Sequence, residues 1–159
     1  MSLAVVYSRA SVGIDAPLIT VEVHLSNGLP CFNLVGLPEA SVREAKDRVR
    51  SALINSGFEF PAKRITVNLA PADLPKEGGR FDLAIAIGII AASNQLTTNQ
   101  LENIELVGEL ALSGEIRSVT GALPFTYACT QAKRIAILPI ENAPEASLIK
   151  DANIIPANQ

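Results

Sequence analysis

The sequence has little aromatic, histidine or cysteine chemistry. Its 159 residues include no tryptophan, one histidine and two cysteines, and aromatic residues make up 4% of the chain. One histidine without clustered carboxylates cannot supply the three or four ligands of a zinc site, and Cys31 and Cys129 form no CxxC motif. We therefore expect no metal centre, and we expect two buried free thiols in a reducing compartment.

Long hydrophobic runs and excess positive charge are missing as well. No apolar run approaches the roughly 18 residues that a membrane span needs, and the start, MSLAVVYSRASVG, lacks the regions of a secretory signal. Thirteen basic and sixteen acidic residues give a net charge of -3, so any contact with nucleic acid must be local. We expect a cytoplasmic protein without a membrane partner.

Motifs for binding a nucleotide are missing too. A P-loop requires GxxxxGK[ST], yet the sequence contains no Gly-Lys pair, and GxGxxG does not occur. His24 lies beside Glu22, and no serine or cysteine has a spacing that makes it a partner for a general base. The sequence therefore predicts neither ATP binding nor histidine-dependent catalysis by this chain, and no cofactor of its own.

What the chain does have is enough apolar sequence for one core, because 48% of its residues are hydrophobic. Residues 3–10 and 18–25 predict strands, and the second alternates apolar and polar residues as a half-buried strand does. Asn27-Gly28 is a common hairpin turn, which predicts that 29–36 returns as the next strand. On this basis the first third of the chain forms an antiparallel sheet.

The stretch 37–57 is the clearest helix, since Val42, Ala45, Val49 and Leu53 form one apolar stripe. On its outer face, Glu39 with Arg43 and Glu44 with Arg48 have the i,i+4 spacing of favourable ion pairs. The remaining elements are a strand at 64–71, helices at 81–93, 119–132 and 143–150, two short strands within 105–117, and strands at 134–139 and 152–156. This order predicts an α/β (α+β) two-layer sandwich of a mixed sheet and helices within a single domain, residues 1–159.

Several long motifs in one order carry a family resemblance. The run from YSRASVGIDAPLITVEVHL through PADLPKEGGRFDLAIAIGIIAAS, followed by VGELALSGEIRSVTGALP and AILPIENAPEA, resembles the N-terminal domain of the ComM/YifB group of bacterial Mg-chelatase-like AAA+ ATPases. The resemblance covers nearly the whole chain. It implies a Lon protease-like fold, also described as ribosomal protein S5 domain 2-like and named ChlI in this family.

Lon-type peptidases use a serine and lysine dyad, and the resemblance locates both positions here. A Lon-type nucleophile loop reads roughly PKDGPSAG, and PKEGGRFD occupies it, with Arg80 in the place of the serine. The lysine motif falls on SVTGALPF, where the matching residue is Leu123. The resemblance thus implies a chain without catalytic residues. The alternative is a peptidase with unfamiliar groups, Ser113 or Ser118 with Lys76.

For the full-length protein the resemblance implies an AAA+ module downstream of residue 159, with ATP and Mg2+ as its cofactors. It also implies a homo-hexamer that acts on DNA, with branch migration during natural transformation as the role of ComM. This chain is then expected to contact its own AAA+ module, neighbouring subunits and DNA. A third alternative is protein interaction alone, through an exposed sheet edge. The candidate DNA or subunit contacts are Arg43, Lys46, Arg50, Lys76 and Arg80.

Overall fold

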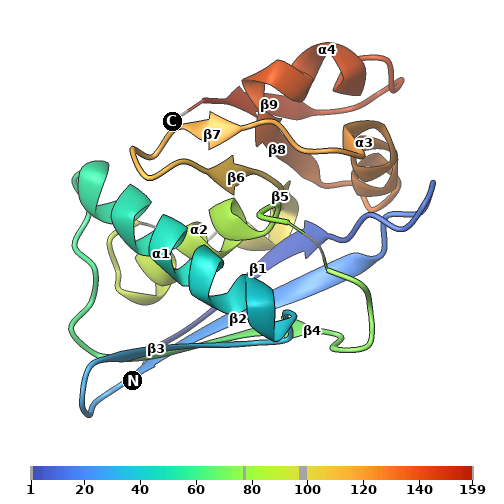
Figure 1. The fold of residues 1–159 in the computed structure, drawn as a ribbon. Coiled ribbons are helices and arrows are strands. Elements are labelled where there is room, and N and C mark those ends of the chain that lie inside the picture. The colour runs from blue at the N-terminus through green and yellow to red at the C-terminus, as the bar shows by residue number, and fades with distance from the viewer. Residues whose placement is uncertain (1, 77, 97–99, 159) are drawn as a thin grey trace.

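A computed structural model describes residues 2–76, 78–96 and 100–158 and shows a twisted sheet with helices on both faces (Figure 1). The sheet has seven strands in the order β3-β4-β2-β1-β5-β8-β9. Parallel and antiparallel pairs are both present, which confirms the predicted mixed α/β sandwich. The strands are β1 (Ser2–Arg9), β2 (Leu18–Ser26), β3 (Cys31–Val35), β4 (Arg64–Ala70), β5 (Ile104–Leu106), β8 (Ile135–Pro139) and β9 (Ile154–Ala157), and a separate ribbon pairs β6 (Glu109–Leu110) with β7 (Ile116–Arg117).

Two groups of helices cover the sheet. α1 (Glu39–Asn55) and α2 (Asp82–Ala92) lie over one face, while α3 (Ala122–Gln131) and α4 (Ala143–Ala146) cover the other face at the β5-β8-β9 end (Figure 1). Short 3-10 helices occupy Leu101–Asn103 and Ile140–Asn142. Consecutive residues of β8 divide between the two cores, since Ile137 packs against the main core with α2 and Leu138 packs with α3.

The main core forms where the sequence pattern predicts it. Ile19, Val21, Val23 and Leu25 on β2 are all buried, and they face α2. α2 itself is apolar on nearly every side because it lies between the sheet and α1, which explains why its sequence has no amphipathic stripe. Among the described residues, no helix has the length and apolar character needed to cross a membrane.

Two predictions about the first third of the chain are wrong. β2 and β3 do not form a hairpin, because β4 lies between them and pairs with β2 along seven positions and with β3 along five. β4 has three buried apolar side chains, whereas Leu34 is the single buried residue of β3. A position inside the sheet therefore buries more apolar surface for β4 than it would for β3.

The second wrong prediction concerns the cysteines. Cys31 is exposed on β3, and only Cys129 is buried; both thiols are free.

Close packing of α2 on β2 depends on Gly88. A methyl group at this position would lie 2.5 Å from a methyl of Val23, whose branched side chain has little freedom to move away. We predict that Gly88→Ala lowers the free energy of unfolding by about 1–3 kcal/mol, although alanine is the better helix former. Urea unfolding should show this loss, and Gly88→Ala should cost much less stability when it is introduced into the Val23→Ala variant. An unchanged or higher stability for Gly88→Ala alone would contradict this packing.

Candidate functional site

The loop PADLPKEGGR runs from the end of β4 to the start of α2 and turns its first basic side chain inward. Lys76 is 2% exposed, and its Nζ donates hydrogen bonds to the carbonyl oxygens of Pro71, at 2.6 Å, and Leu74, at 3.2 Å. Burial lowers the pKa of Lys76. The ammonium group therefore closes its own loop in this structure and does not reach outward.

Arg80 is buried as well, at 6% exposure. Its Nε donates to the carbonyl oxygen of Arg9 at 3.0 Å, and its Nη1 donates to that of Thr120 at 2.6 Å. Gly121 directly precedes α3 and has a φ of 76°. A β-carbon at this position would lie 2.7 Å from Oγ of Ser11 and 3.9 Å from Nη1 of Arg80. Burial lowers the pKa of Arg80 to about 10. The side chain therefore joins the loop to the end of β1 and to the turn before α3.

The first residue of α2 forms a buried ion pair. Asp82 is 1% exposed, its Oδ2 lies 2.6 Å from Nε of Arg48 on α1, and the same oxygen accepts a hydrogen bond from the Leu110 amide at 3.1 Å. Gly79 leaves room for the carboxylates of Glu109 and Asp82, which a β-carbon would meet within 3 Å. Burial raises the pKa of Asp82 to about 6, against the opposing effect of Arg48.

A small hollow lies beside Arg80, with a volume of about 170 Å³. Glu109, Ser118 and Thr120 line it together with the two loop glycines. A serine and lysine dyad would need a hydroxyl within hydrogen-bond reach of an amine. Across residues 2–76, 78–96 and 100–158, no hydrogen bond joins a lysine amine to a serine hydroxyl, and Lys76 uses its Nζ for loop carbonyls.

A second buried ionic cluster lies on the opposite face of the sheet. Glu105 is completely buried and accepts hydrogen bonds from Arg9, at 2.6 and 3.0 Å, and from Arg134, at 3.0 Å. The Arg134 guanidinium also lies over the ring of Tyr7, 4.3 Å from its centre. Burial, and to a smaller extent the negative charge of Glu105, raises the pKa of Cys129 to about 12. This thiol is therefore unreactive. The cluster fastens β5 to β1 beneath α3.

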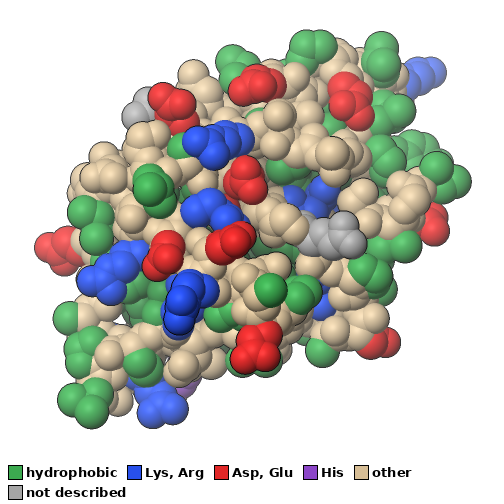
Figure 2. Space-filling view, viewed as in Figure 1, with side chains coloured by type: hydrophobic (Ala, Val, Ile, Leu, Met, Phe, Trp, Pro, Cys, Tyr) green, Lys and Arg blue, Asp and Glu red, His purple; other side chains and the backbone are tan. Residues whose placement is uncertain are grey.

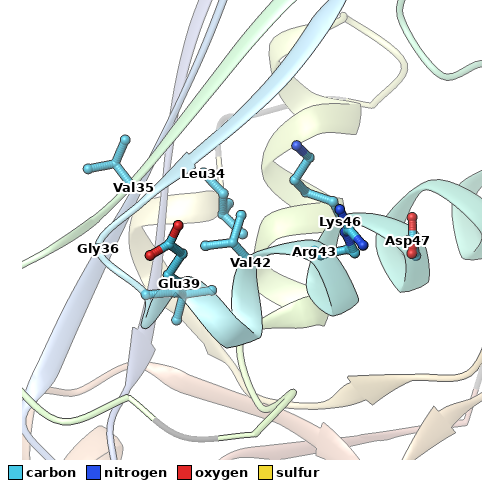
Figure 3. Close-up of a pocket in the computed structure, with 9 residues that line it drawn as sticks. Leu34, Val35, Gly36, Glu39, Val42, Arg43, Lys46 and Asp47 are labelled. Carbon is cyan, nitrogen blue, oxygen red and sulfur yellow. The ribbon is translucent and has the colours of Figure 1, made fainter.

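A groove lies between β3 and α1. It has a volume of about 730 Å³ and continues past the end of β3 at Gly36 (Figure 3). In the close-up, Val42 of α1 points toward Leu34 of β3, which gives the groove an apolar floor. The full lining is Leu34, Val35, Gly36, Leu37, Glu39, Val42, Arg43, Lys46 and Asp47.

The structure separates the five basic residues predicted as contacts. Arg43 and Lys46 line the groove, whereas Arg50 packs over the ring of Phe60 with 5.1 Å to its centre. Lys76 and Arg80 are buried in the loop and donate hydrogen bonds to backbone carbonyls, although Nη2 of Arg80 has no partner among the described residues. Arg43 and Lys46 thus share one groove, and Arg50, which is also exposed on α1, lies outside its lining.

The outer face of α1 mixes both signs of charge. Figure 2 shows basic and acidic side chains interspersed over and around this helix, without a broad patch of one sign. The predicted pair of Glu44 and Arg48 forms at 3.7 Å, but the predicted pair of Glu39 and Arg43 does not come within ion-pair distance. Arg48 makes its closer contact inward, to Asp82, and sequence spacing gave no sign of that partner.

Comparison with known proteins places the chain in a family. The family model described as subunit ChlI of Mg-chelatase matches residues 21–142. The chain is 65% identical over 153 residues to the competence protein ComM of Haemophilus influenzae, an alignment that covers 96% of this chain and 30% of that protein. The chain belongs to the ComM/YifB family of Mg-chelatase-like proteins.

Further members of the ComM/YifB family show the same coverage. YifB of Salmonella typhimurium is 62% identical over 149 residues, covering 94% of this chain and 29% of that protein. A protein of Mycobacterium tuberculosis is 40% identical over 158 residues, covering 97% of this chain and 31% of that protein. The chain therefore spans about 30% of the length of these ComM/YifB relatives.

The buried carboxyl of Asp82 predicts a pH dependence of stability. Its pKa in the folded chain, about 6, lies above the value of about 3.9 expected in the unfolded chain, so the folded chain binds this proton more tightly. Between about pH 4 and pH 6 the free energy of unfolding should therefore fall as pH rises, and Asp82→Asn should remove this part of the slope. Urea unfolding at several pH values measures both proteins. Parallel pH profiles for the two would contradict the prediction.

Proposed function

We propose that this chain is a non-catalytic domain of a ComM/YifB-type AAA+ ATPase. The observation that carries the proposal is the state of Arg80, which occupies the position of a Lon-type nucleophile. Its guanidinium is buried and bound by the carbonyl oxygens of Arg9 and Thr120. A nucleophile must be presented to a substrate, whereas Nε and Nη1 of this side chain bind backbone carbonyls inside the protein.

The second position of the dyad supports the same proposal. Leu123 stands where a Lon-type lysine would be, and an apolar side chain can neither accept a proton nor donate one. In this structure its backbone amide donates to the carboxylate of Glu145 at 3.0 Å, which ties the first turn of α3 to α4. Neither position therefore offers a side chain suited to peptidase chemistry.

The proposed role of the chain is to support ring assembly or DNA engagement by the full-length protein. We propose that this protein is a hexameric ATPase that uses ATP and Mg2+ and acts in DNA branch migration during natural transformation. The name of the Haemophilus influenzae relative, a competence protein, supports this process. Arg43 and Lys46 are the residues proposed to meet DNA or a neighbouring subunit, because they share one accessible groove.

Peptidase activity tests the non-catalytic assignment. We expect that neither the 159-residue chain nor the full-length protein hydrolyses fluorescein-labelled casein, because no described serine is activated by a lysine. The measurement is the release of labelled peptides over hours with a Lon-type peptidase as the positive control. Hydrolysis by the purified protein that disappears in both Lys76→Ala and Ser118→Ala would establish the alternative peptidase and end the proposal.

Charge reversal tests the contact role in the full-length protein. We predict that Arg43→Glu with Lys46→Glu lowers either the hexamer fraction or the affinity for branched DNA, because both proposed contacts use these cations. Lys133→Glu with Lys150→Glu is the matched control, since it makes the same change of charge at exposed positions after α3 and α4. If DNA contact is lost, the slope of log affinity against log salt should fall by about one for each phosphate contact removed. Equal assembly and equal DNA affinity in the two double variants would contradict the role.

A further inference from the structure

β3 has a free edge beside the groove. It is the first strand of the sheet order, and within residues 2–76, 78–96 and 100–158 it pairs with β4 alone. The amide of Cys31 donates to the carbonyl of Lys63 on the β4 side, and successive strand residues direct their backbone groups to opposite edges. Phe32 and Leu34 therefore direct their N–H and C=O groups away from β4, toward the open edge.

The two outer strands of the sheet differ in how they are protected. β9, at the far edge, contains Pro156, whose missing N–H is one of the devices that block pairing at an edge. β3, with the sequence CFNLV, contains neither proline nor a charged residue. Its edge is therefore chemically ready to accept another strand.

The walls of the groove indicate the side chains that such a strand would carry. Leu34 and Val42 form an apolar floor, and Lys46 extends from α1 toward the sheet (Figure 3). The ion pairs of the described residues include neither Arg43 nor Lys46. Two cations beside an apolar floor and a free backbone edge suit an extended peptide with apolar and acidic side chains.

We infer that the groove between β3 and α1 binds an extended segment of another polypeptide, which adds as an eighth strand to the edge of β3. Apolar side chains of this segment lie against Leu34 and Val42, and an acidic side chain faces Arg43 and Lys46. This inference rests on the proposed contact role of α1, and it names an extended polypeptide as the partner.

The same groove suits a polypeptide better than a nucleic acid. Glu39 and Asp47 stand among its lining residues, so a phosphate backbone lying along the groove would meet carboxylates as well as Arg43 and Lys46. A phosphate backbone favours a surface of one sign, and Figure 2 shows no such surface around α1. Backbone groups at a strand edge, in contrast, are satisfied fully by another peptide backbone.

The test selects ligands for the 159-residue chain from a phage-displayed library of random decapeptides. We expect the selected peptides to alternate apolar residues and to include aspartate or glutamate. Their affinity should fall about tenfold or more for Arg43→Glu with Lys46→Glu and stay unchanged for Lys133→Glu with Lys150→Glu. Circular dichroism confirms that each variant is folded.

Amide hydrogen exchange provides the readout that is specific to strand addition. Binding of a selected peptide should slow exchange at the amides of Phe32 and Leu34, which have no partner in β4. A 30-nucleotide single-stranded DNA serves as the competing probe. The inference is overturned if no peptide is enriched above background, if peptides bind both double variants equally, if these two amides are unaffected, or if DNA protects them instead.

Failure here is distinguishable from failure of the proposed function. The absence of casein hydrolysis and the assembly of the full-length protein are measured without any peptide. A chain that binds no peptide could therefore still be a non-catalytic domain, and a chain that hydrolyses casein could still bind a strand at β3.

Discussion

The buried guanidinium of Arg80 fixes the arrangement on which the other features depend. Its two hydrogen bonds hold the start of α2 against the end of β1 and the turn before α3. Two residues later, Asp82 meets Arg48 and so fixes α1 over α2. The groove between α1 and β3 exists because α1 is held there. Arg80 and Asp82 thus connect the start of α2 to β1, to the turn before α3 and to α1.

A loop that resembles a nucleophile-presenting turn has therefore taken up a structural task. The glycines and the sharp bend that would expose a nucleophile here admit a buried arginine, whose Nε and Nη1 bind backbone carbonyls while its Nη2 is buried without a partner among the described residues. Function is determined by the sites that a fold carries and not by the fold itself. The accessible surface with the most distinctive chemistry is the groove beside β3, where a free strand edge meets unpaired charges.

Local pattern was sufficient to predict most elements, because their periodicity reports burial directly. The alternation in β2 and the apolar stripe of α1 both match the observed core. Pairing was less predictable: Asn27-Gly28 favours a local hairpin, but the longer apolar strand β4 wins the place beside β2 through contacts distant in sequence. Hydrophobic periodicity specifies which face of a strand is buried, and it does not specify the neighbour.

The candidate site was predictable in part for a related reason. Spacing along α1 predicts that Arg43, Lys46 and Arg50 share one helical face; Arg43 and Lys46 line the groove, whereas Arg50 packs over Phe60. The same spacing assigned Arg48 to Glu44, whereas its closer partner is Asp82, which only tertiary folding brings near. Lys76 and Arg80 read as accessible cations in a polar loop, yet both are buried, because loop carbonyls that no sequence pattern reveals accept their hydrogen bonds.

The free energy of unfolding of Arg80→Met, measured against the wild-type chain in urea, tests most directly whether Arg80 is a structural clamp. If it is, the variant should lose about 2 kcal/mol or more, because the carbonyl oxygens of Arg9 and Thr120 lose their donors inside the protein. An unchanged or higher stability would contradict the clamp, since it would show that this buried cation costs at least as much as its hydrogen bonds contribute.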